Sequence, residues 1–513
     1  MLHNWYSYAT HCHVQGTSQS GKSKFSEHCI REHILAGNGA CLIDWHGTLY
    51  QSLVRYLAYV QPNRPIVLLN PSDGEYVIPF NPFALPTGRE PSSHVNRLAS
   101  VLVKPWGAEN TNELPNYEWI VKMVLAFMAA TGEPLHHAAK LLEFPKKELR
   151  EYAISRIEDD YTKQQWKQLQ YVQSLTEWNR HVGSTQRRLG RFLSSRSIVR
   201  FTGLKRPGIS IAECIRQKAI LLINLKPSHL LDPDSARVFA ALLLSEFLDA
   251  AIENMGDPQP YFLYLDECQN YLTTDAAQIL DQVLKSGLRL TLLHHHLGQF
   301  HDNMPLKGSI DTNAKLKVVF AGLPLDEAKW MAEEFFLSEA NERLCKEVRY
   351  RYRTEHVEMP YEVETESENG TSSSGFVGEV ETGSWGRSSG RSVQRGTRFV
   401  PVEHKERDGQ EDYGRDEKIA KLAARFASLK RGECYVKTPD DVYRYTVPWV
   451  EDYLLNPATF LQYKQSLHRN ALTPTEADQL LKDEERKFLE RSKEYESTGG
   501  RPKKKPAALH PQR

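Results

Sequence analysis

The chain has 513 residues, of which 40% are hydrophobic and 25% are charged, and its 65 basic residues balance its 65 acidic ones. These values are typical of a soluble globular protein with two to four domains, or one large domain with insertions. Apolar runs such as Ala219–Leu225 are shorter than the roughly 20 residues of a bilayer span, and the N-terminus lacks a signal-peptide core. Seven dispersed cysteines without a CxxC pair indicate reduced thiols. A cytoplasmic protein is therefore expected, rather than a secreted or self-anchored one.

The first part of the chain, residues 1–90, alternates short apolar runs with helical patterns. The expected strands are His11–Gln15, Ala40–Asp44 and Ile66–Asn70, and the expected helices are Lys24–Leu35 and Leu49–Tyr59. Strands separated by helices of this length predict βαβ units and a parallel sheet. Residues 91–200 have almost no β-branched runs. Segments such as Tyr117–Ala130 and Asp160–Leu175 have helical apolar spacing, which predicts an all-helical insertion.

The sheet pattern resumes over residues 201–362. Expected strands are Ala219–Leu225, Tyr261–Leu265, Arg289–Leu293 and Lys317–Ala321, and expected helices are Ser235–Ile252, Asp275–Lys285 and Leu325–Phe336. The alternation predicts an α/β fold with a central, mostly parallel sheet that is completed by both halves of the chain.

The last third of the chain changes in composition. Residues 363–400 are rich in Glu, Ser and Gly, which predicts a disordered loop. A return to the core is expected over 401–455, where Cys434–Val436 and Tyr443–Val447 are predicted to pair as edge strands. Residues 456–513 are read as a small extension with a charged helix and a basic tail. That tail, Arg491–Arg513, has seven basic and two acidic residues, a net charge of +5 (7 − 2). A basic tail of this kind would remain solvated or add affinity for an anionic partner.

The segment from residue 16 to residue 23 fits the phosphate-binding pattern G-x-x-x-x-G-K-[ST]. Its residues are Gly16, Thr17, Ser18, Gln19, Ser20, Gly21, Lys22 and Ser23. The glycines let backbone N–H groups face a phosphate at the positive end of the following helix. Lys22 is predicted to reach the β- and γ-phosphates of ATP, and the Ser23 hydroxyl is predicted to bind Mg²⁺.

Two carboxylates follow the apolar run Tyr261–Leu265 directly. We predict that Asp266 holds Mg²⁺ and that Glu267 orients or deprotonates the attacking water. Two carboxylates at the end of a strand could equally be helix caps or solvated charges. In a chain that also has a phosphate loop, they favour nucleotide hydrolysis. The chain has neither an N-K-x-D guanine-reading motif nor an L-S-G-G-Q segment, which lowers the GTPase and ABC-type interpretations.

Three adjacent histidines, His294, His295 and His296, follow the next expected strand. Neighbouring residues of a strand point to opposite faces, so a shared metal site is the weaker interpretation. γ-Phosphate sensing and core packing are the alternatives. A second group, His11, Cys12 and His13, is interpreted as an ordinary segment.

Together these residues resemble the HerA/FtsK superfamily of ATP-driven DNA pumps, and within it the HerA-like and TraD/TraG-like conjugative ATPases. The resemblance covers most of residues 10–450. Besides the phosphate loop, it rests on Ile43–Gly47, Pro79–Pro82, Ile220–Leu225, Leu265–Asn270 and Thr312–Ala314. It implies a RecA-like P-loop core. The family's sensor segment, H-Q-x-L-x-Q, corresponds to residues 294–299, with His295 in place of the first glutamine, which implies catalytic roles for His295 and Gln299.

The resemblance further implies a ring, expected to be a hexamer, with DNA in its central channel. An arginine of the neighbouring subunit would complete each nucleotide site, and Arg187, Arg188 and Arg191 are the candidates. Because the phosphate loop begins near residue 15, a separate N-terminal module, nuclease or membrane-channel partner is expected. Such a partner could also recruit the chain to the inner face of a membrane. The alternatives are an assembly or docking ATPase that acts on protein partners, and a non-hydrolysing relative.

Overall fold

A computed structural model describes residues 10–85, 89–103, 114–205, 208–253, 258–272, 280, 283–300, 304–377 and 380–497. The chain divides into two compact units. The first comprises Met1–Phe335 and Ala423–Arg513, and the second comprises Phe336–Leu422. No helix within the described ranges is long and apolar enough to cross a membrane.

A nine-stranded sheet forms the centre of the first unit, in the order β11-β10-β7-β1-β6-β5-β2-β4-β3. Strands β1 to β7 pair in parallel, whereas β10 is antiparallel to both β7 and β11. The strands are β1 Cys12–Gln15, β2 Gly39–Asp44, β3 Ile66–Leu69, β4 Ile220–Asn224, β5 Tyr261–Leu265, β6 Leu288–His294, β7 Leu316–Phe320, β10 Glu433–Lys437 and β11 Val442–Thr446. The predicted α/β fold with a mostly parallel sheet is confirmed.

The helices of this unit connect and cover the strands. They are α1 Lys22–Leu35, α2 Thr48–Val60, α3 Pro91–Val103, α4 Leu114–Thr131, α5 Leu135–Ala138, α6 Lys147–Arg156, α7 Asp160–Gln170, α8 Leu175–Ser194, α9 Arg196–Thr202, α10 Ile211–Arg216, α11 Pro233–Glu253, α13 Met304–Asn313, α14 Leu325–Phe335, α17 Pro457–Leu467 and α18 Pro474–Ser497. Helices α1 and α2 pack on β2, and α2 also packs on β4. The strands β1, β2, β4, β5 and β7 are buried throughout, as expected for a parallel sheet covered on both faces.

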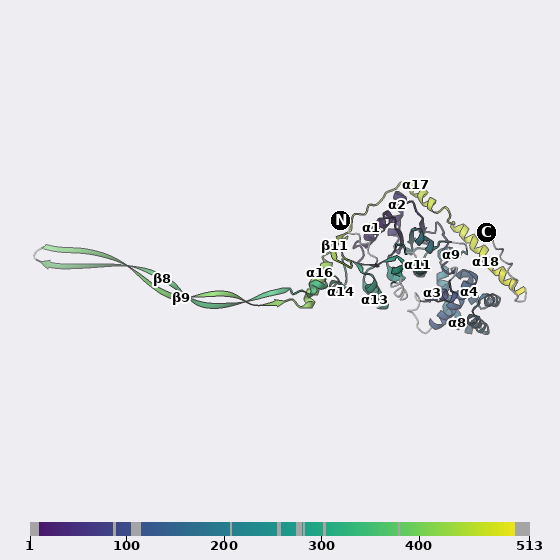
Figure 1. Cartoon of the computed structure of the whole chain (residues 1–513), viewed down its shortest axis with the longest axis horizontal. Coiled ribbons are helices and arrows are strands. Elements are labelled where there is room, and N and C mark those ends of the chain that lie inside the picture. The colour runs from purple at the N-terminus through teal and green to yellow at the C-terminus, as the bar shows by residue number, and fades with distance from the viewer. Residues whose placement is uncertain are drawn as a thin grey trace. The chain divides into compact units, whose positions relative to one another are not determined.

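Between β3 and β4 the described residues form helices and no strand. Figure 1 shows α3, α4 and α8 grouped together in this stretch. The helical pattern expected over Asp160–Leu175 is interrupted, because α7 ends at Gln170 and Ser174 caps α8. The Ser174 hydroxyl accepts a hydrogen bond of 3.1 Å from the Glu177 N–H. The helix predicted at Asp275–Lys285 lies largely outside the described residues.

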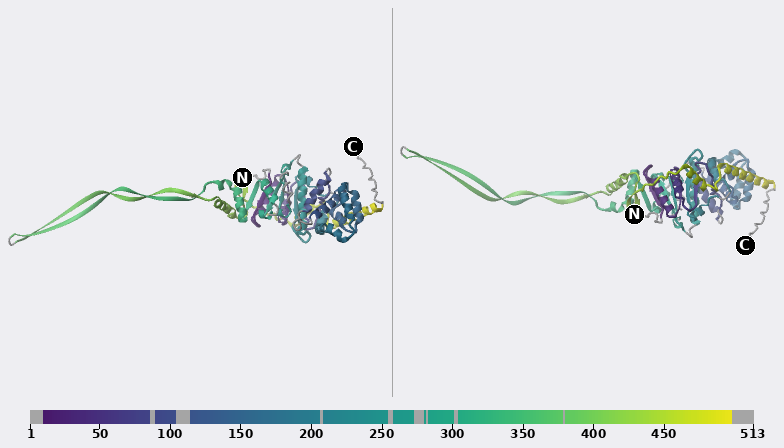
Figure 2. Two further views of the ribbon diagram at one scale, coloured as in Figure 1. Left: turned by 90° about the horizontal axis from the view of Figure 1, so that it is seen from below. Right: turned by 90° about the horizontal axis from the view of Figure 1, so that it is seen from above.

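The second unit contains a long antiparallel hairpin between the short helix α15 (Leu337–Asn341) and α16 (Arg415–Ala427). Its strands are β8 (Cys345–Val377) and β9 (Val380–Asp412), which pair with each other along their length. Figure 2 shows the two strands twisting around each other. The prediction of a disordered loop over 363–400 differs from this structure. The prediction used composition, which indicates how much apolar surface a segment can bury. A two-stranded hairpin is also stabilised by cross-strand hydrogen bonds and side-chain pairs, which composition does not reveal.

Candidate nucleotide site

The phosphate loop joins β1 to α1 and has a backbone that only glycine accepts at two positions. Gly16 and Gly21 have φ angles of 153° and 122°. A Cβ on Gly16 would lie 2.5 Å from Phe320 Cβ, and a Cβ on Gly21 would lie 2.9 Å from Gly432 Cα. Both glycines are therefore required by backbone angle and by space. The loop ends at Lys22, the first residue of α1, where the helix dipole favours an anion.

Lys22 is buried inside this loop. Its Nζ donates to Gly16 O at 2.5 Å and Thr17 O at 3.0 Å, and lies 3.3 Å from His295 Nδ1. Burial lowers the pKa of Lys22, while the nearby charges of Glu267 and Asp266 act in the opposite direction. The ammonium group thus lies among backbone oxygens, and a phosphate entering the loop would replace them as its partner.

Asp266 follows β5 at the edge where β2 ends in Asp44. The two strands pair in parallel, with Ile43 opposite Leu265, so their carboxyl ends meet. Burial, followed by the charges of Asp44 and Glu267, raises the pKa of Asp266 to about 7. A buried carboxylate next to other carboxylates is a favourable ligand for a hard cation such as Mg²⁺, which prefers oxygen.

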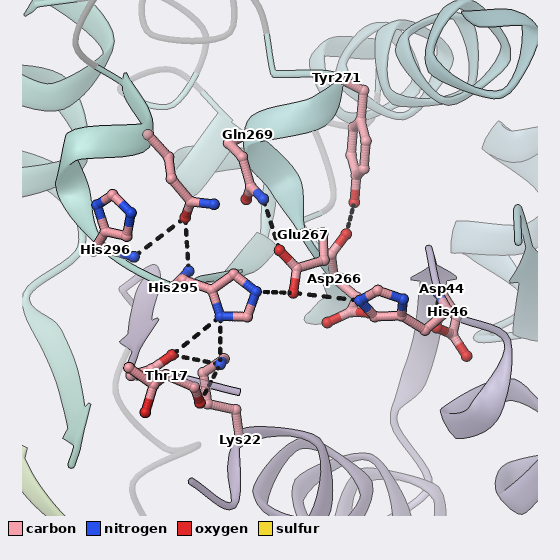
Figure 3. A network of polar contacts seen from close by, with 12 residues as sticks. Thr17, Lys22, Asp44, His46, Asp266, Glu267, Gln269, Tyr271, His295 and His296 are labelled. Atoms are coloured by element: carbon pink, nitrogen blue, oxygen red, sulfur yellow. Dashed lines mark hydrogen bonds and ion pairs between the residues drawn. The ribbon is translucent and has the colours of Figure 1, made fainter. Parts of the chain in front are cut away.

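Glu267 has a left-handed backbone, with φ 47° and ψ 47°, which is uncommon for a residue with a side chain. Its Oε1 lies 3.0 Å from His295 Nε2 and 3.6 Å from His46 Nε2, and its Oε2 accepts a hydrogen bond of 2.6 Å from Gln269 Nε2. Figure 3 shows this carboxylate between the two imidazoles. Burial acts against ionisation, but His46, Gln269 and the charges of His295 and Lys22 together lower the pKa of Glu267 to about 2. The side chain is therefore ionised and fixed in place.

The three adjacent histidines have three different environments. His294 is buried, with Nε2 2.5 Å from His13 Nε2, and burial lowers the pKa of His294 to about 3. His295 faces Glu267 and Lys22, and His296 Nδ1 lies 3.6 Å from Glu327 Oε1. Within the part of the chain that the structure describes, no group of His, Cys, Asp and Glu is arranged to hold a metal ion.

The Gln299 side chain forms hydrogen bonds with the backbone at the end of β6. Its Oε1 accepts hydrogen bonds from the N–H groups of His295 and His296, at 2.8 and 3.2 Å. Glu327 similarly accepts from the N–H groups of Leu297 and Gly298, at 3.0 and 2.9 Å. These contacts fix the turn that directs His295 toward Lys22 and Glu267 (Figure 3).

The structure thus brings Lys22, Asp266, Glu267 and His295 to one edge of the sheet. Ser23 lies in the first turn of α1 and is exposed, as are Thr17, Ser18 and Gln19, whereas Gly16 and Ser20 are buried. Two contacts of Glu267, His46 and Gln269, were not among the predicted site residues. His46 could have been predicted from the sequence, because it follows a strand that ends beside Asp266.

The predicted arginine candidates lie on α8. Arg188 stacks over the ring of Tyr117, with its Cζ 4.7 Å from the ring centroid. Arg187 and Arg191 are exposed.

Comparison with solved structures shows a related fold. The unbound bacterial conjugative coupling protein TrwBdeltaN70 matches with a TM-score of 0.50 and 14% identity, over 88% of this chain and 87% of that chain. TrwB in complex with ADP and Mg²⁺ matches with the same score and identity, over 88% of each chain. The chain has the fold of TrwB. At the level of the fold, this confirms the resemblance to conjugative coupling ATPases.

VirB4 of Thermoanaerobacter pseudethanolicus also matches, with a TM-score of 0.47 and 10% identity over 88% of this chain and 90% of that chain. No protein-family profile and no curated protein matches the sequence.

Proposed function

We propose that this chain is an Mg²⁺-dependent ATPase that moves DNA, in conjugation, mobile-element transfer or DNA processing. The observation that carries the proposal is the contact chain from Lys22 through His295 to Glu267, which joins a phosphate loop to an ionised carboxylate. The TrwB fold supports it, because one of the similar structures is a plasmid coupling protein in complex with ADP and Mg²⁺.

ATP is proposed to bind with its phosphates in the loop of residues 16–23. Lys22 would leave the carbonyl oxygens of Gly16 and Thr17 for the β- and γ-phosphates. Ser23 and Asp266 would hold Mg²⁺, which supplies charge neutralisation between the phosphates. Protonated Asp266 would lose its proton when the cation binds, because a nearby positive charge favours the carboxylate.

Glu267 is proposed to orient the attacking water. A carboxylate with a pKa of about 2 is a weak base, so its main contribution in this arrangement is position rather than proton abstraction. His295 lies between Glu267 and Lys22, where a γ-phosphate would also be within reach. It is proposed to contact that phosphate in place of a glutamine, with Gln299 as a positioning residue that fixes the backbone of His295.

A ring, proposed to be a hexamer, would place a second subunit beside this site, which lies at the sheet edge. Arg187, Arg188 or Arg191 of that second subunit is proposed to complete the site in trans. DNA is proposed to be held through its backbone in the channel, with a nuclease or a membrane-channel protein as a separate partner. We place this activity in the cytoplasm, with that partner recruiting the ring to the inner face of a membrane.

Steady-state ATP hydrolysis with and without single- and double-stranded DNA tests the proposal. Stimulation by DNA that is abolished by Glu267→Gln is expected. A hydrolysis rate that does not change with either form of DNA but increases when a protein partner is added would favour the docking ATPase instead. The absence of hydrolysis under all conditions, with nucleotide bound, would favour the non-hydrolysing relative.

A further inference from the structure

The β8–β9 hairpin is a two-stranded ribbon of unusual length, with 33 residues in each strand. A ribbon of only two strands is marginally stable in water, and each of its outer edges presents backbone N–H and C=O groups to further pairing. Figures 1 and 2 show β8 and β9 side by side along their described lengths. The ribbon therefore has two open edges, which are not equivalent because one belongs to β8 and the other to β9.

The two faces of this ribbon differ sharply in charge. Directly opposite residues share a face, so the printed register from Val357↔Val400 to Glu368↔Ser389 assigns twelve residues to each face. We call the face of Glu358 and its alternate neighbours the charged face, and that of Val357 the uncharged face. The charged face comprises Glu358, Pro360, Glu362, Glu364, Glu366, Glu368, Ser389, Arg391, Val393, Arg395, Thr397 and Phe399, and the uncharged face comprises Val357, Met359, Tyr361, Val363, Thr365, Ser367, Gly390, Ser392, Gln394, Gly396, Arg398 and Val400.

On the charged face the acidic and basic residues are separated by strand. All five glutamates lie on β8 and both arginines lie on β9. Ion pairs already join the strands within the hairpin: Arg395 Nε lies 2.5 Å from Glu362 Oε1, and Arg391 Nε lies 3.0 Å from Glu366 Oε1. Five carboxylates against two guanidinium groups leave an excess of negative charge along the β8 edge. A β9 strand of another copy beside β8 would bring two further arginines next to this acidic row.

We propose that β8 of one copy of this chain pairs with β9 of a second copy, edge to edge and antiparallel. The acidic row of β8 then lies beside the arginine row of the neighbouring β9, which repeats the cross-strand pairs seen within the hairpin. Because the β8 edge and the β9 edge are different surfaces, the contact is head to tail and can continue from copy to copy around a closed ring. This goes beyond the proposed function and does not depend on ATP hydrolysis.

Two prolines mark where the edge-to-edge pairing between copies begins along the hairpin. Pro360 and Pro401 have no N–H group, so within a paired ribbon their nitrogens must face the outer edges. At those positions each edge lacks a donor, so edge-to-edge pairing is confined to the part of the hairpin beyond them, toward residues 377 and 380. That part includes Glu362, Glu364 and Glu366 together with Arg391 and Arg395.

A second copy fits this surface better than nucleic acid does. The charged face has a net charge of −3 over the twelve residues (2 − 5), and the uncharged face has a single basic residue, Arg398. Neither offers the rows of lysine and arginine that phosphates require. On the uncharged face the Tyr361 ring lies against Gly396, where an added Cβ would be 2.9 Å from the ring. In the shared sheet, these uncharged faces would form one continuous surface.

Pyrene excimer emission from the full chain tests the pairing. The label is placed at Ser367→Cys on the uncharged face, in a Cys345→Ser background, because Cys345 is exposed and the other cysteines are buried. One variant carries Glu362→Lys, Glu364→Lys and Glu366→Lys, and the other carries Arg391→Glu and Arg395→Glu. Either variant alone should lose excimer emission by about tenfold, because like charges then face each other, and an equimolar mixture should regain it.

Matched variants separate this pairing from simple unfolding of the hairpin. Arg351→Glu with Arg353→Glu reverses two charges on the other side of the prolines, as many as the Arg391→Glu and Arg395→Glu variant, and should leave the excimer unchanged. Glu364→Pro removes only a donor on the outer edge and should weaken the excimer, whereas Glu364→Gln should weaken it less. Sedimentation of the same samples reports the oligomeric state separately. Oligomers without excimer, or excimer unaffected by the reversals and by Glu364→Pro, would overturn the pairing while leaving the proposed ring and ATPase intact.

Discussion

At the scale of single residues, the functions proposed for Lys22 and Glu267 depend on fixed spacings that can be seen in the sequence. The phosphate loop is contiguous, and Asp266 and Glu267 directly follow a buried strand, so both could be predicted without a structure. The contacts of Glu267 with His46 and Gln269 could not. They depend on which strands are neighbours in the sheet and on the left-handed backbone of Glu267, and neither is encoded in a local pattern.

The two steps of the proposed reaction should separate in two variants. Lys22→Ala should abolish nucleotide binding, because the buried ammonium is the main charge available to the phosphates. Glu267→Gln should bind ATP normally and lower kcat by about 10²–10⁴-fold, because only water orientation is lost. Fluorescent-nucleotide titration and single-turnover hydrolysis measure the two effects. Unchanged hydrolysis in Glu267→Gln would remove this residue from the mechanism.

His295 should act on the chemical step and not on ATP affinity. Replacing it with alanine removes a donor proposed to face the γ-phosphate and should lower kcat by about 10²-fold. Glutamine also donates a hydrogen bond, so His295→Gln should retain activity within about tenfold of the original. A comparison of kcat and KM for the two variants checks this. If alanine and glutamine behave alike, the imidazole serves only to hold Glu267 in place.

At the scale of elements, the sequence predicted the parallel strands because each is a short apolar run between helices. It failed where tertiary pairing decides the outcome. The hairpin strands β8 and β9 are polar, and their order comes from partners that are far apart in sequence, such as Glu362 and Arg395. The charged helix α18 was expected, but its packing was not. Phe488 of α18 is fully buried and stacks on His137, with ring centroids 5.0 Å apart.

Docking of α18 should depend on pH through Asp478 and Glu133. Hydrogen bonds from Arg200 lower the pKa of Asp478 to about 2. Burial on its own would raise the pKa of Glu133, but the contacts with His137, Lys205 and Arg491 outweigh burial and lower it. A carboxyl group whose pKa is lower in the folded state stabilises the fold at pH values above its unfolded-state pKa, which is about 4. This stabilisation is lost as the pH falls through the folded-state pKa.

Hydrogen exchange of the α18 amides measures this docking. At neutral pH, Asp478→Asn should increase exchange across α18, because it breaks the pairs with Arg196 and Arg200. The difference from the unsubstituted chain should shrink as the pH falls from about 4 toward about 2. Asp483→Asn is the control, since Asp483 contacts Arg486 and Gln479, which both lie within α18. Equal exchange in Asp478→Asn and the unsubstituted chain at neutral pH would refute the role of these pairs.

At the scale of the whole molecule, the sheet order brings sequence-distant segments to one edge of the sheet, where the candidate site lies. The phosphate loop after β1, the carboxylates after β5 and the histidines after β6 meet there because β1, β6 and β5 are consecutive neighbours in the sheet. A helical stretch between β3 and β4 therefore separates Lys22 from Asp266 in sequence without separating them in space. The same fold occurs in the plasmid coupling protein TrwB.

Movement along DNA driven by ATP hydrolysis, as proposed here, makes the ATPase rate depend on DNA length. The rate is measured on linear DNA of increasing length at a constant nucleotide concentration, with a circular molecule as the endless limit. A motor leaves at the ends, so the rate should rise with length toward the value for the circle, and Glu267→Gln should show no rise. A rate that is stimulated equally by short, long and circular DNA, or by none of them, would contradict the account.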